Sequence, residues 1–241
     1  MHKAFYLTFS ICFIFLSNLQ GSNKDSIDLF LQKQFQAGKL NGNVLIVKNG
    51  TTVYENSFGF TDGTRKEPLS KQHKFIIGSI YKEFPAVTIL QLVELEQLKL
   101  SDKLNEHLLD LPSWANEITI THFLQYSSGL PKVNWNKYFS NNIMLTEELL
   151  YEDIQQIDSL AFTPGSDYLY SNMGPILLTK VVESVTGIPF KGYVQKHILD
   201  RYGLFGIKFK EQYPYKYPSL MAIPFNTDSQ ADSYNIAVPG L

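Results

Sequence analysis

The stretch FIIGSIYKEFPAVTILQLVELEQL, residues 75–98, decides the fold because it joins a reactive pair to a long apolar segment. Ser79 and Lys82 stand three residues apart at its head, a spacing that places a hydroxyl and an amine on one face of a helix. A serine beside an amine that accepts its proton is an activated nucleophile. The stretch therefore predicts a buried helix with a nucleophile at its start.

The features around this pair support a reactive serine over a chance S-x-x-K on a surface helix. From Ile80 to Leu98 the apolar residues cover more than one helical face, which predicts a largely buried helix. We therefore expect Lys82 to be partly desolvated, which favours the uncharged amine that an activated serine needs. Gly78 places Ser79 at the helix head, where free amides and the helix dipole favour negative charge. Pro85 predicts a bend or a first turn of altered geometry.

Tyr170 and Asn172, in the segment PGSDYLYSN at residues 164–172, form a second candidate pair. A tyrosine serves as an acid or a base, and an asparagine can hold both a lysine and a substrate amide. Residues 54–56 match the same Y-x-N pattern, but they fall on a predicted strand, where packing is the expected role. The Pro-Gly pair that opens the segment predicts a turn, so we expect Tyr170 and Asn172 on an exposed loop.

The order of these segments resembles the serine β-lactamase-like family, which includes class C β-lactamases, DD-peptidases and related esterases. S-x-x-K is followed by ITITHFLQYSSGLP at 118–131, by PGSDYLYSN and by LLTKVVESVTG at 177–187. S-x-x-K is a signature of penicillin-interacting enzymes. The similarity runs from about Gly42 to Gly206. It implies an α/β (α+β) fold of the β-lactamase/transpeptidase type, with a helical lobe and an antiparallel sheet lobe.

The resemblance also implies a role for each site residue. Ser79 would be the acyl-accepting nucleophile, and its backbone amide would be half of the oxyanion hole. Lys82 would help to deprotonate Ser79, and Tyr170 would carry a proton between Ser79 and the leaving group. Asn172 would orient Lys82 and the substrate. Because the identity of the acylation base is unsettled in this superfamily, Lys82 and Tyr170 are assigned as a coupled pair.

The chain departs from the family's pattern in two places. Tyr126 stands where the family usually has a histidine, a change that we expect to affect packing more than chemistry. The family's third motif, K-T-G or H-x-G on a late strand, has no match after Tyr170. In relatives that strand supplies the second oxyanion amide, and losing one such donor typically lowers turnover about 100- to 1000-fold. We therefore expect either part of a longer protein or a shortened copy with poor or no activity.

The sheet signals are few. Strands at residues 43–48 and 52–58 flank Asn49-Gly50, a strong hairpin signal. Ile207–Phe209 indicates one further short strand, so the sheet is expected to be incomplete. Helices are predicted at residues 25–37, 118–126, 146–158 and 173–186, the last one ending at Gly187. The expected layout is a signal peptide over 1–21 and a single domain over 22–241, with 22–70 in the sheet lobe, 71–205 in the helical lobe, and 206–241 a partial return to the sheet lobe.

The N-terminus resembles a secretory signal. An apolar run from Ala4 to Leu16 follows Lys3, and a cleavage position lies after Gly21. The run is too short to span a bilayer. Cys12, the chain's one cysteine, lies inside the run and leaves lipidation as an alternative. We expect an exported protein, periplasmic or secreted, that is a monomer without a stable membrane span after signal removal.

Charge and motif content exclude several other classes. The net charge is -2, from 21 Lys and Arg and 23 Asp and Glu, so nucleic acid is not an expected partner. The sequence has no H-x-x-x-H or H-E-x-x-H spacing, and His122 on an apolar helix is expected to be structural. It also lacks G-x-S-x-G, P-loop and G-x-G-x-x-G motifs. We therefore expect no metal and no cofactor.

These expectations converge on a serine hydrolase. It would form an acyl-enzyme at Ser79 with an ester, a β-lactam or a D-alanyl peptide, so its substrate would be a small molecule or a peptidoglycan peptide. Two alternatives remain open. One is a catalytically inactive module that binds cell-wall peptides through the same cleft, and the other is a non-functional, C-terminally truncated fragment.

Overall fold

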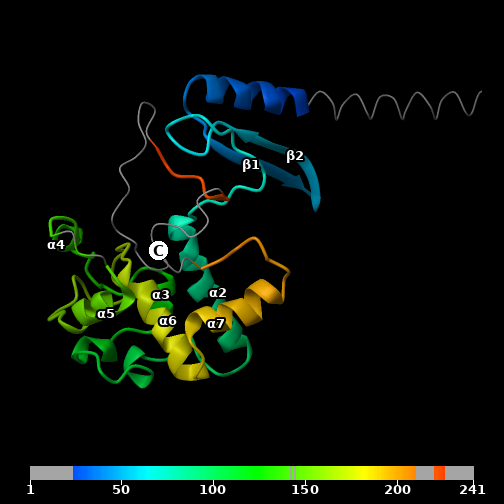
Figure 1. Ribbon diagram of the computed structural model, residues 1–241. Coiled ribbons are helices and arrows are strands. Elements are labelled where there is room, and N and C mark those ends of the chain that lie inside the picture. Colours follow the sequence, from blue (N-terminus) through cyan, green and yellow to red (C-terminus); the bar gives the residue numbers. More distant parts are fainter. Residues whose placement is uncertain (1–23, 142, 144, 210–219, 226–241) are drawn as a thin grey trace, which may run out of the picture. The chain divides into compact units, whose positions relative to one another are not determined.

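The computed structural model describes residues 24–141, 143, 145–209 and 220–225, and Figure 1 labels its two strands and helices α2 to α7. Residues 24–36 are helical. The elements that follow are β1 Gly42–Lys48, β2 Thr51–Phe58, the 3-10 helix η1 Gly78–Lys82, α2 Glu83–Glu94, the 3-10 helices η2 Leu104–Glu106 and η3 Ser113–Asn116, α3 Ile120–Leu124, α4 Trp135–Phe139, α5 Glu147–Gln155, α6 Met173–Thr186, α7 Phe190–Val194 and the π-helical turn η4 Gln195–Asp200.

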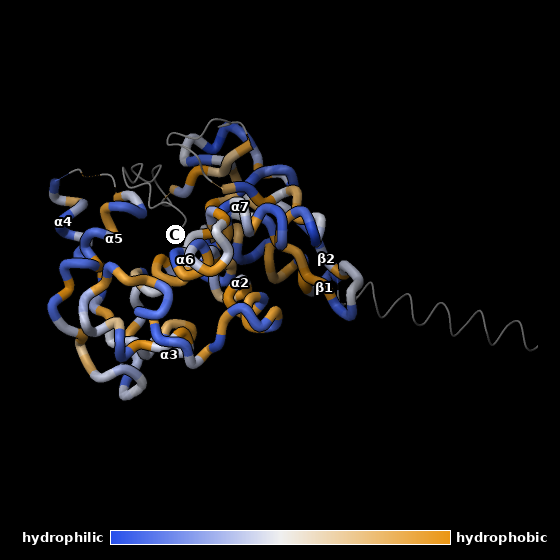
Figure 2. Tube along the Cα trace, turned by 90° about the horizontal axis from the view of Figure 1, so that it is seen from below, coloured by the Kyte–Doolittle hydropathy of each residue, from blue (hydrophilic) through white to orange (hydrophobic). Residues whose placement is uncertain are grey.

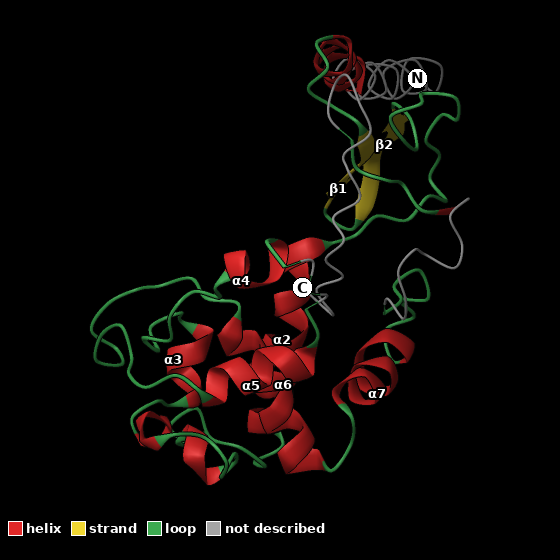
Figure 3. Ribbon diagram, turned by 60° about the vertical axis from the view of Figure 1, so that its left-hand side comes forward, coloured by secondary structure: helices red, strands yellow, loops and turns green. Residues whose placement is uncertain are grey.

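The described residues form two compact units. One contains residues 24–76 and 220–225, and the other contains residues 77–209. The two strands, yellow in Figure 3, belong to the first unit, and all the labelled helices belong to the second. The predicted signal peptide lies outside the described residues, as does most of the segment predicted to return to the sheet lobe.

β1 and β2 form the predicted antiparallel hairpin. Asn49 and Gly50 have φ of +50° and +75°, which is the conformation of the tight hairpin turn that Asn-Gly favours. Each strand begins one residue earlier than predicted and ends as predicted. Within the described residues the sheet has two strands, so it is incomplete, as expected.

The helix at residues 24–36 packs on the hairpin. The Tyr54 hydroxyl donates a hydrogen bond to Asp28 Oδ1 at 2.6 Å, and the rings of Phe35 and Phe58 lie 6.3 Å apart. Tyr54 is buried, so the Y-x-N match at 54–56 has the packing role that the sequence indicated.

Residues 220–225 contact the same unit through their backbone. Lys74 N donates to Leu220 O at 2.7 Å, and Ala222 N donates to Lys74 O at 2.9 Å. The strand predicted at Ile207–Phe209 is wrong, because these residues form no strand. Phe209 instead packs its ring edge-on against Tyr81, at 6.4 Å between centroids. The apolar side chain of Phe209 is therefore partly buried by packing on Tyr81 and not by pairing in a strand.

α6 is the central helix of the second unit and packs against α2, α3, α5 and α7. Residues 173–179 of this helix are all buried, and Figure 2 shows hydrophobic residues, in orange, along α2, α3 and α6. Gly187 follows α6 in the left-handed conformation, at φ +65°, which confirms the predicted helix end.

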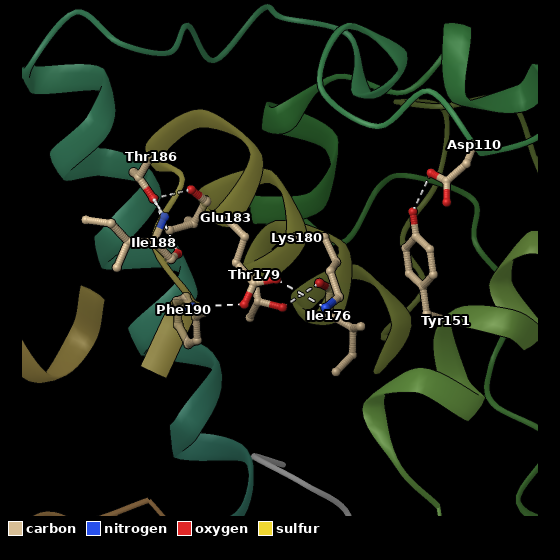
Figure 4. Close-up of polar contacts among 10 residues, drawn as sticks. Asp110, Tyr151, Ile176, Thr179, Lys180, Glu183, Thr186, Ile188 and Phe190 are labelled. Carbon is tan, nitrogen blue, oxygen red and sulfur yellow. Dashed lines mark hydrogen bonds and ion pairs between the residues drawn. The ribbon is translucent and has the colours of Figure 1, made fainter. Parts of the chain in front are cut away.

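Polar side chains tie α6 to its surroundings (Figure 4). Glu183 accepts hydrogen bonds from Phe190 N at 2.9 Å and Lys180 Nζ at 3.1 Å, so one carboxylate holds both α6 and the start of α7. Tyr151 on α5 donates to Asp110 at 2.7 Å. These contacts hold the C-terminal half of α6 to the start of α7, and α5 to the segment that carries Asp110.

The helix predicted from Ile80 to Leu98 differs from the structure in two ways. It is split into η1 and α2, and it ends at Glu94. It is also buried on one face only, because Val87 and Leu90 are 42% and 50% exposed. The buried residues are spaced as a single stripe toward α6 and are Pro85, Thr88, Ile89 and Leu92.

Pro85 lies in the first turn of α2, where a backbone amide has no intrahelical partner to lose. The turn before it is a 3-10 helix rather than an α-helix. The prediction of a first turn with altered geometry is therefore confirmed, and no bend within α2 is needed.

Replacing Gly187 by alanine is expected to lower the free energy of unfolding by about 1 kcal/mol, because a Cβ disfavours the left-handed conformation. A Cβ at Gly187 would meet no atom within 4 Å, so the cost is conformational and not steric. Urea unfolding of the variant measures it. Gly206→Ala is the matched control, since this glycine is equally open but has no positive φ, and equal losses in the two variants would contradict the argument.

Within the part of the chain that the structure describes, no helix is both long and apolar enough to cross a membrane.

Candidate active site

Ser79 and Lys82 lie on η1, at the head of α2. A 3-10 helix has three residues per turn, so side chains three apart stand directly above one another. Lys82 Nζ lies 3.0 Å from Ser79 Oγ, which confirms the predicted contact. Lys82 is buried, with 7% of its surface exposed, whereas Ser79 is exposed. A shielded amine therefore contacts an accessible hydroxyl.

Tyr170 brings a third group to the same oxygen. Its hydroxyl lies 3.0 Å from Ser79 Oγ, although the two residues are 91 positions apart in the sequence. Lys82 Nζ lies 5.2 Å from the centre of the Tyr170 ring. Tyr170 is 38% exposed, as expected for a residue on a loop. An amine and a phenol therefore converge on one hydroxyl, and either group is placed to exchange a proton with it.

The contacts of Tyr170 set its acidity. Burial alone would raise the pKa of Tyr170, but hydrogen bonding to Lys82 and Ser79 and the charge on Lys82 outweigh it, so the pKa lies below the ordinary 10.0. A lowered pKa increases the fraction of Tyr170 that is ionised at a given pH. The phenolate accepts the proton of a hydroxyl more readily than the phenol does.

The loop that carries Tyr170 is held by the segment YSSGLP at residues 126–131. Backbone amides of Leu169 and Gly165 donate to Tyr126 O at 2.9 Å and Ser127 O at 2.8 Å. The Ser171 hydroxyl also donates to Pro131 O at 2.8 Å. The YSSGLP segment therefore positions the loop that carries Tyr170.

Asn172 occupies the N-cap position of α6, but its side chain makes no capping hydrogen bond. It is half-buried, so the expectation of an exposed loop is wrong for this residue. Its Oδ1 is buried and has no hydrogen-bond partner among the described residues. A buried acceptor without a partner is uncommon in folded proteins. The contact with Lys82 that the resemblance implied is therefore not made through this oxygen, which is available to a donor on a ligand.

Tyr126 takes part in the site in a way that the sequence did not indicate. Its ring stacks on that of Tyr170, with 4.9 Å between centroids and 20° between planes. Tyr168 lies edge-on to Tyr126 at 6.1 Å. The expectation that this position affects packing holds, but the packing is against a site residue. Its place at the start of the YSSGLP motif was the only signal available.

His122 is structural, as predicted. Its Nδ1 accepts a hydrogen bond from Thr119 N at 3.2 Å, which closes the first turn of α3. Burial, and then the charge on Lys103, lower the pKa of His122 and favour the neutral ring that accepts this bond. The residues that the structure describes contain no group of three or more acidic, histidine or cysteine side chains suited to a metal ion.

A serine at a helix head, with an amine one turn later and a phenol from a distant loop, is the arrangement expected of the serine β-lactamase and penicillin-binding class. The β-lactamase family model matches residues 12–217. The chain therefore belongs to the β-lactamase family.

Two curated relatives illustrate this membership. The chain is 30% identical to penicillin-binding protein 4* of Bacillus subtilis (strain 168) over 166 residues, 66% of this chain and 36% of that protein. It is 28% identical to protein flp of Staphylococcus aureus (strain MW2) over 189 residues, 75% of this chain and 37% of that protein. The chain thus spans well under half the length of these relatives.

Solved structures confirm the predicted fold class. An octameric penicillin-binding protein homologue from Pyrococcus abyssi superposes with a TM-score of 0.70 at 24% identity, covering 86% of this chain and 49% of that one. A class C β-lactamase in complex with cefoxitin gives a TM-score of 0.72 at 20% identity, covering 88% of this chain and 57% of that one. At these identities the likeness concerns the fold alone.

Proposed function

We propose that this chain carries the acylation site of a serine hydrolase, with Ser79 as its nucleophile. The observation behind the proposal is that Lys82 Nζ and Tyr170 Oη both lie 3.0 Å from Ser79 Oγ. A serine is a weak nucleophile until an adjacent base takes its proton, and this arrangement provides two groups for that purpose.

The reaction proceeds in two halves. As Ser79 Oγ bonds to the carbonyl carbon, its proton passes to the coupled pair of Lys82 and Tyr170. The pair returns a proton to the leaving group, and water then releases the acyl group from Ser79. The backbone amide of Ser79 donates to the developing oxyanion. Asn172 Oδ1, which is buried and has no hydrogen-bond partner in the described part of the chain, accepts a hydrogen bond from the substrate.

The substrate is an ester, a β-lactam or a D-alanyl peptide. All three present a carbonyl carbon with a leaving group, which is what an acyl-accepting serine requires. The name of one relative, a penicillin-binding protein, favours the β-lactam. The apolar run at residues 4–16 supports export to the periplasm or the medium, where such carbonyls occur.

A binding module without turnover is the second candidate. The observation in its favour is the buried Asn172 Oδ1, which has no hydrogen-bond partner among the described residues and could accept a bond from a ligand without any reaction. In that case the same site would bind cell-wall peptides without forming a covalent bond.

Site mapping of a covalent adduct tests the first proposal. The purified chain is incubated with a fluorescent penicillin and, separately, with a fluorophosphonate, and then analysed by intact mass and tryptic digestion. Trypsin releases FIIGSIYK, residues 75–82, in which Ser79 is the one serine. We expect one adduct per chain on this peptide, assigned to Ser79 by fragmentation. A cooperatively folded chain that gains no adduct, or gains it on another serine, would overturn the proposal.

A further inference from the structure

Tyr170 lies on a loop and is partly exposed, yet its hydroxyl must stay on one oxygen for the site to work. An exposed aromatic side chain normally has several rotamers, and fixing one costs entropy. The ring of Tyr126, stacked at 4.9 Å, covers a face of Tyr170 and restricts that choice. Stacked aromatic pairs are stabilised beyond the burial of their area, so the stack favours one rotamer over its neighbours.

The backbone of Tyr126 is itself held in an uncommon state. Its φ is +54°, a left-handed conformation that is unfavourable for a residue with a Cβ. Tyr126 N donates to Phe123 O at 3.1 Å, and Ser127 N donates to His122 O at 2.8 Å, which maintains this conformation. Leu169 N, next to Tyr170, donates to Tyr126 O at 2.9 Å. A strained backbone conformation of this kind persists only where surrounding contacts hold it in place, and it is often found at functional sites.

We propose that Tyr126 is a positioning residue, whose stacked ring holds the Tyr170 hydroxyl against Ser79. The proposal rests on the function proposed above for Ser79, because it assigns Tyr126 to the same site. The stacked ring of Tyr126 fixes the side chain of Tyr170, and the hydrogen bond from Leu169 N to Tyr126 O fixes the loop that carries it.

The hydroxyl of Tyr126 is not needed for this role. Burial, followed by its proximity to Tyr170, Tyr168 and Glu83, raises the pKa of Tyr126 to about 12. The phenol is therefore neutral over the range in which proteins work and does not exchange protons with the site. Phenylalanine at this position should keep the stack and the function.

Two variants separate the ring from the backbone. Tyr126→Asn removes the ring but suits the left-handed conformation, which asparagine adopts more readily than other residues with a Cβ. Tyr126→Phe keeps the ring. Since general acid–base groups contribute about 100- to 10,000-fold, partial loss of Tyr170's placement should slow fluorophosphonate labelling of Ser79 by at least about tenfold in Tyr126→Asn. Tyr126→Phe should restore the rate to within about threefold of wild type.

The titration of Tyr170 provides a readout that does not depend on activity. Its pKa is followed by NMR in chains carrying carbon-13-labelled tyrosine, with Tyr170→Phe used to assign the signal. Hydrogen bonding to Lys82 and Ser79 lowers this pKa and burial raises it. If Tyr126 positions the ring, Tyr126→Asn releases the hydroxyl from both partners and the pKa rises toward 10.0. If Tyr126 only shields the ring, the loss of burial lowers the pKa further.

The outcomes are distinct. A risen Tyr170 pKa with slower labelling in Tyr126→Asn, both reversed in Tyr126→Phe, supports positioning. An unchanged or lowered pKa, or a labelling rate equal to wild type, overturns it. The matched control Tyr202→Asn, at a tyrosine that is 61% exposed, should change neither quantity. If wild-type Ser79 is not labelled at all, the proposed function fails, whereas the titration still decides whether Tyr126 holds Tyr170.

Discussion

Replacing Lys82 by methionine is expected to slow acylation of Ser79 about 1000-fold, within the range that positioned acid–base groups contribute. Lys82 Nζ lies 3.0 Å from Ser79 Oγ. The change therefore removes a proton acceptor in the state with a neutral amine, and in the protonated state it removes the positive charge that favours the Tyr170 phenolate. Methionine has a similar length and suits the buried position of Lys82. The second-order rate of fluorophosphonate labelling measures the effect.

Two further variants define the origin of this loss. Lys82→Arg keeps the charge but cannot give up its proton, so it should be nearly as slow as the methionine variant if the amine accepts a proton. Ser79→Ala sets the background rate, which should be indistinguishable from zero. Recovery of most of the wild-type rate in Lys82→Arg would show that only the positive charge matters and would leave Tyr170 as the acceptor.

Thermal melting excludes a trivial cause. If Lys82→Met melts cooperatively near the wild-type temperature, then its slow labelling arises from the chemistry of the site. Labelling of this folded variant at the wild-type rate would contradict the role assigned to Lys82, and with it the proposed mechanism.

The parts of the fold that were predicted correctly are those determined by local chemistry. The Asn49-Gly50 turn and the Gly187 helix end both need a positive φ that glycine and asparagine supply. Such signals depend on one or two residues and their immediate neighbours. Ser79 and Lys82 belong to the same class, because three residues of helix suffice to bring them together.

Tyr170 could not be assigned to Ser79 by spacing, since 91 residues separate them. The order of motifs, which resembles that of a known family, predicted the contact instead. The stack of Tyr126 on Tyr170 was missed because it depends on a positive φ at a tyrosine, and nothing in the residue type indicates that conformation. A long-range contact made by an atypical backbone has no local sequence signal.

The incorrect predictions have a tertiary origin. Residues 207–209 have the apolar character of a strand, but Phe209 satisfies it by packing on Tyr81. Val87 and Leu90 contributed to the prediction of a buried helix, yet the contact of α2 with α6 covers a single stripe. Hydrophobicity indicates that a side chain gains from burial, but not whether a partner is present to bury it.

Replacing Gly129 by alanine is expected to lower the free energy of unfolding by about 3 kcal/mol, the sum of a left-handed conformation for alanine and an overpacked contact. The φ of Gly129 is +79°, and a Cβ there would lie 2.3 Å from Phe162 O. The neighbour is a backbone oxygen, which cannot rotate away as a side chain can. Urea unfolding followed by circular dichroism measures the loss.

The same change should also damage the site. Gly129 O accepts a hydrogen bond from Ala161 N at 2.8 Å, so these two segments touch directly. The added methyl group must push the 160–162 segment away, and the loop that carries Tyr170 follows this segment in sequence. We therefore expect the chains that remain folded to label at Ser79 more slowly than wild type.

Gly165→Ala separates the two contributions. Gly165 has φ +85°, so alanine there has the same conformational cost as alanine at Gly129. A Cβ at Gly165, however, would meet the His122 side chain at 3.2 Å. A side chain can shift by a few tenths of an ångström, so the loss should be about 1–2 kcal/mol, the conformational part alone. A loss in Gly129→Ala no larger than this would mean that the Phe162 carbonyl yields. The contact between the YSSGLP segment and the Tyr170 loop would then deform more easily than its backbone hydrogen bonds indicate.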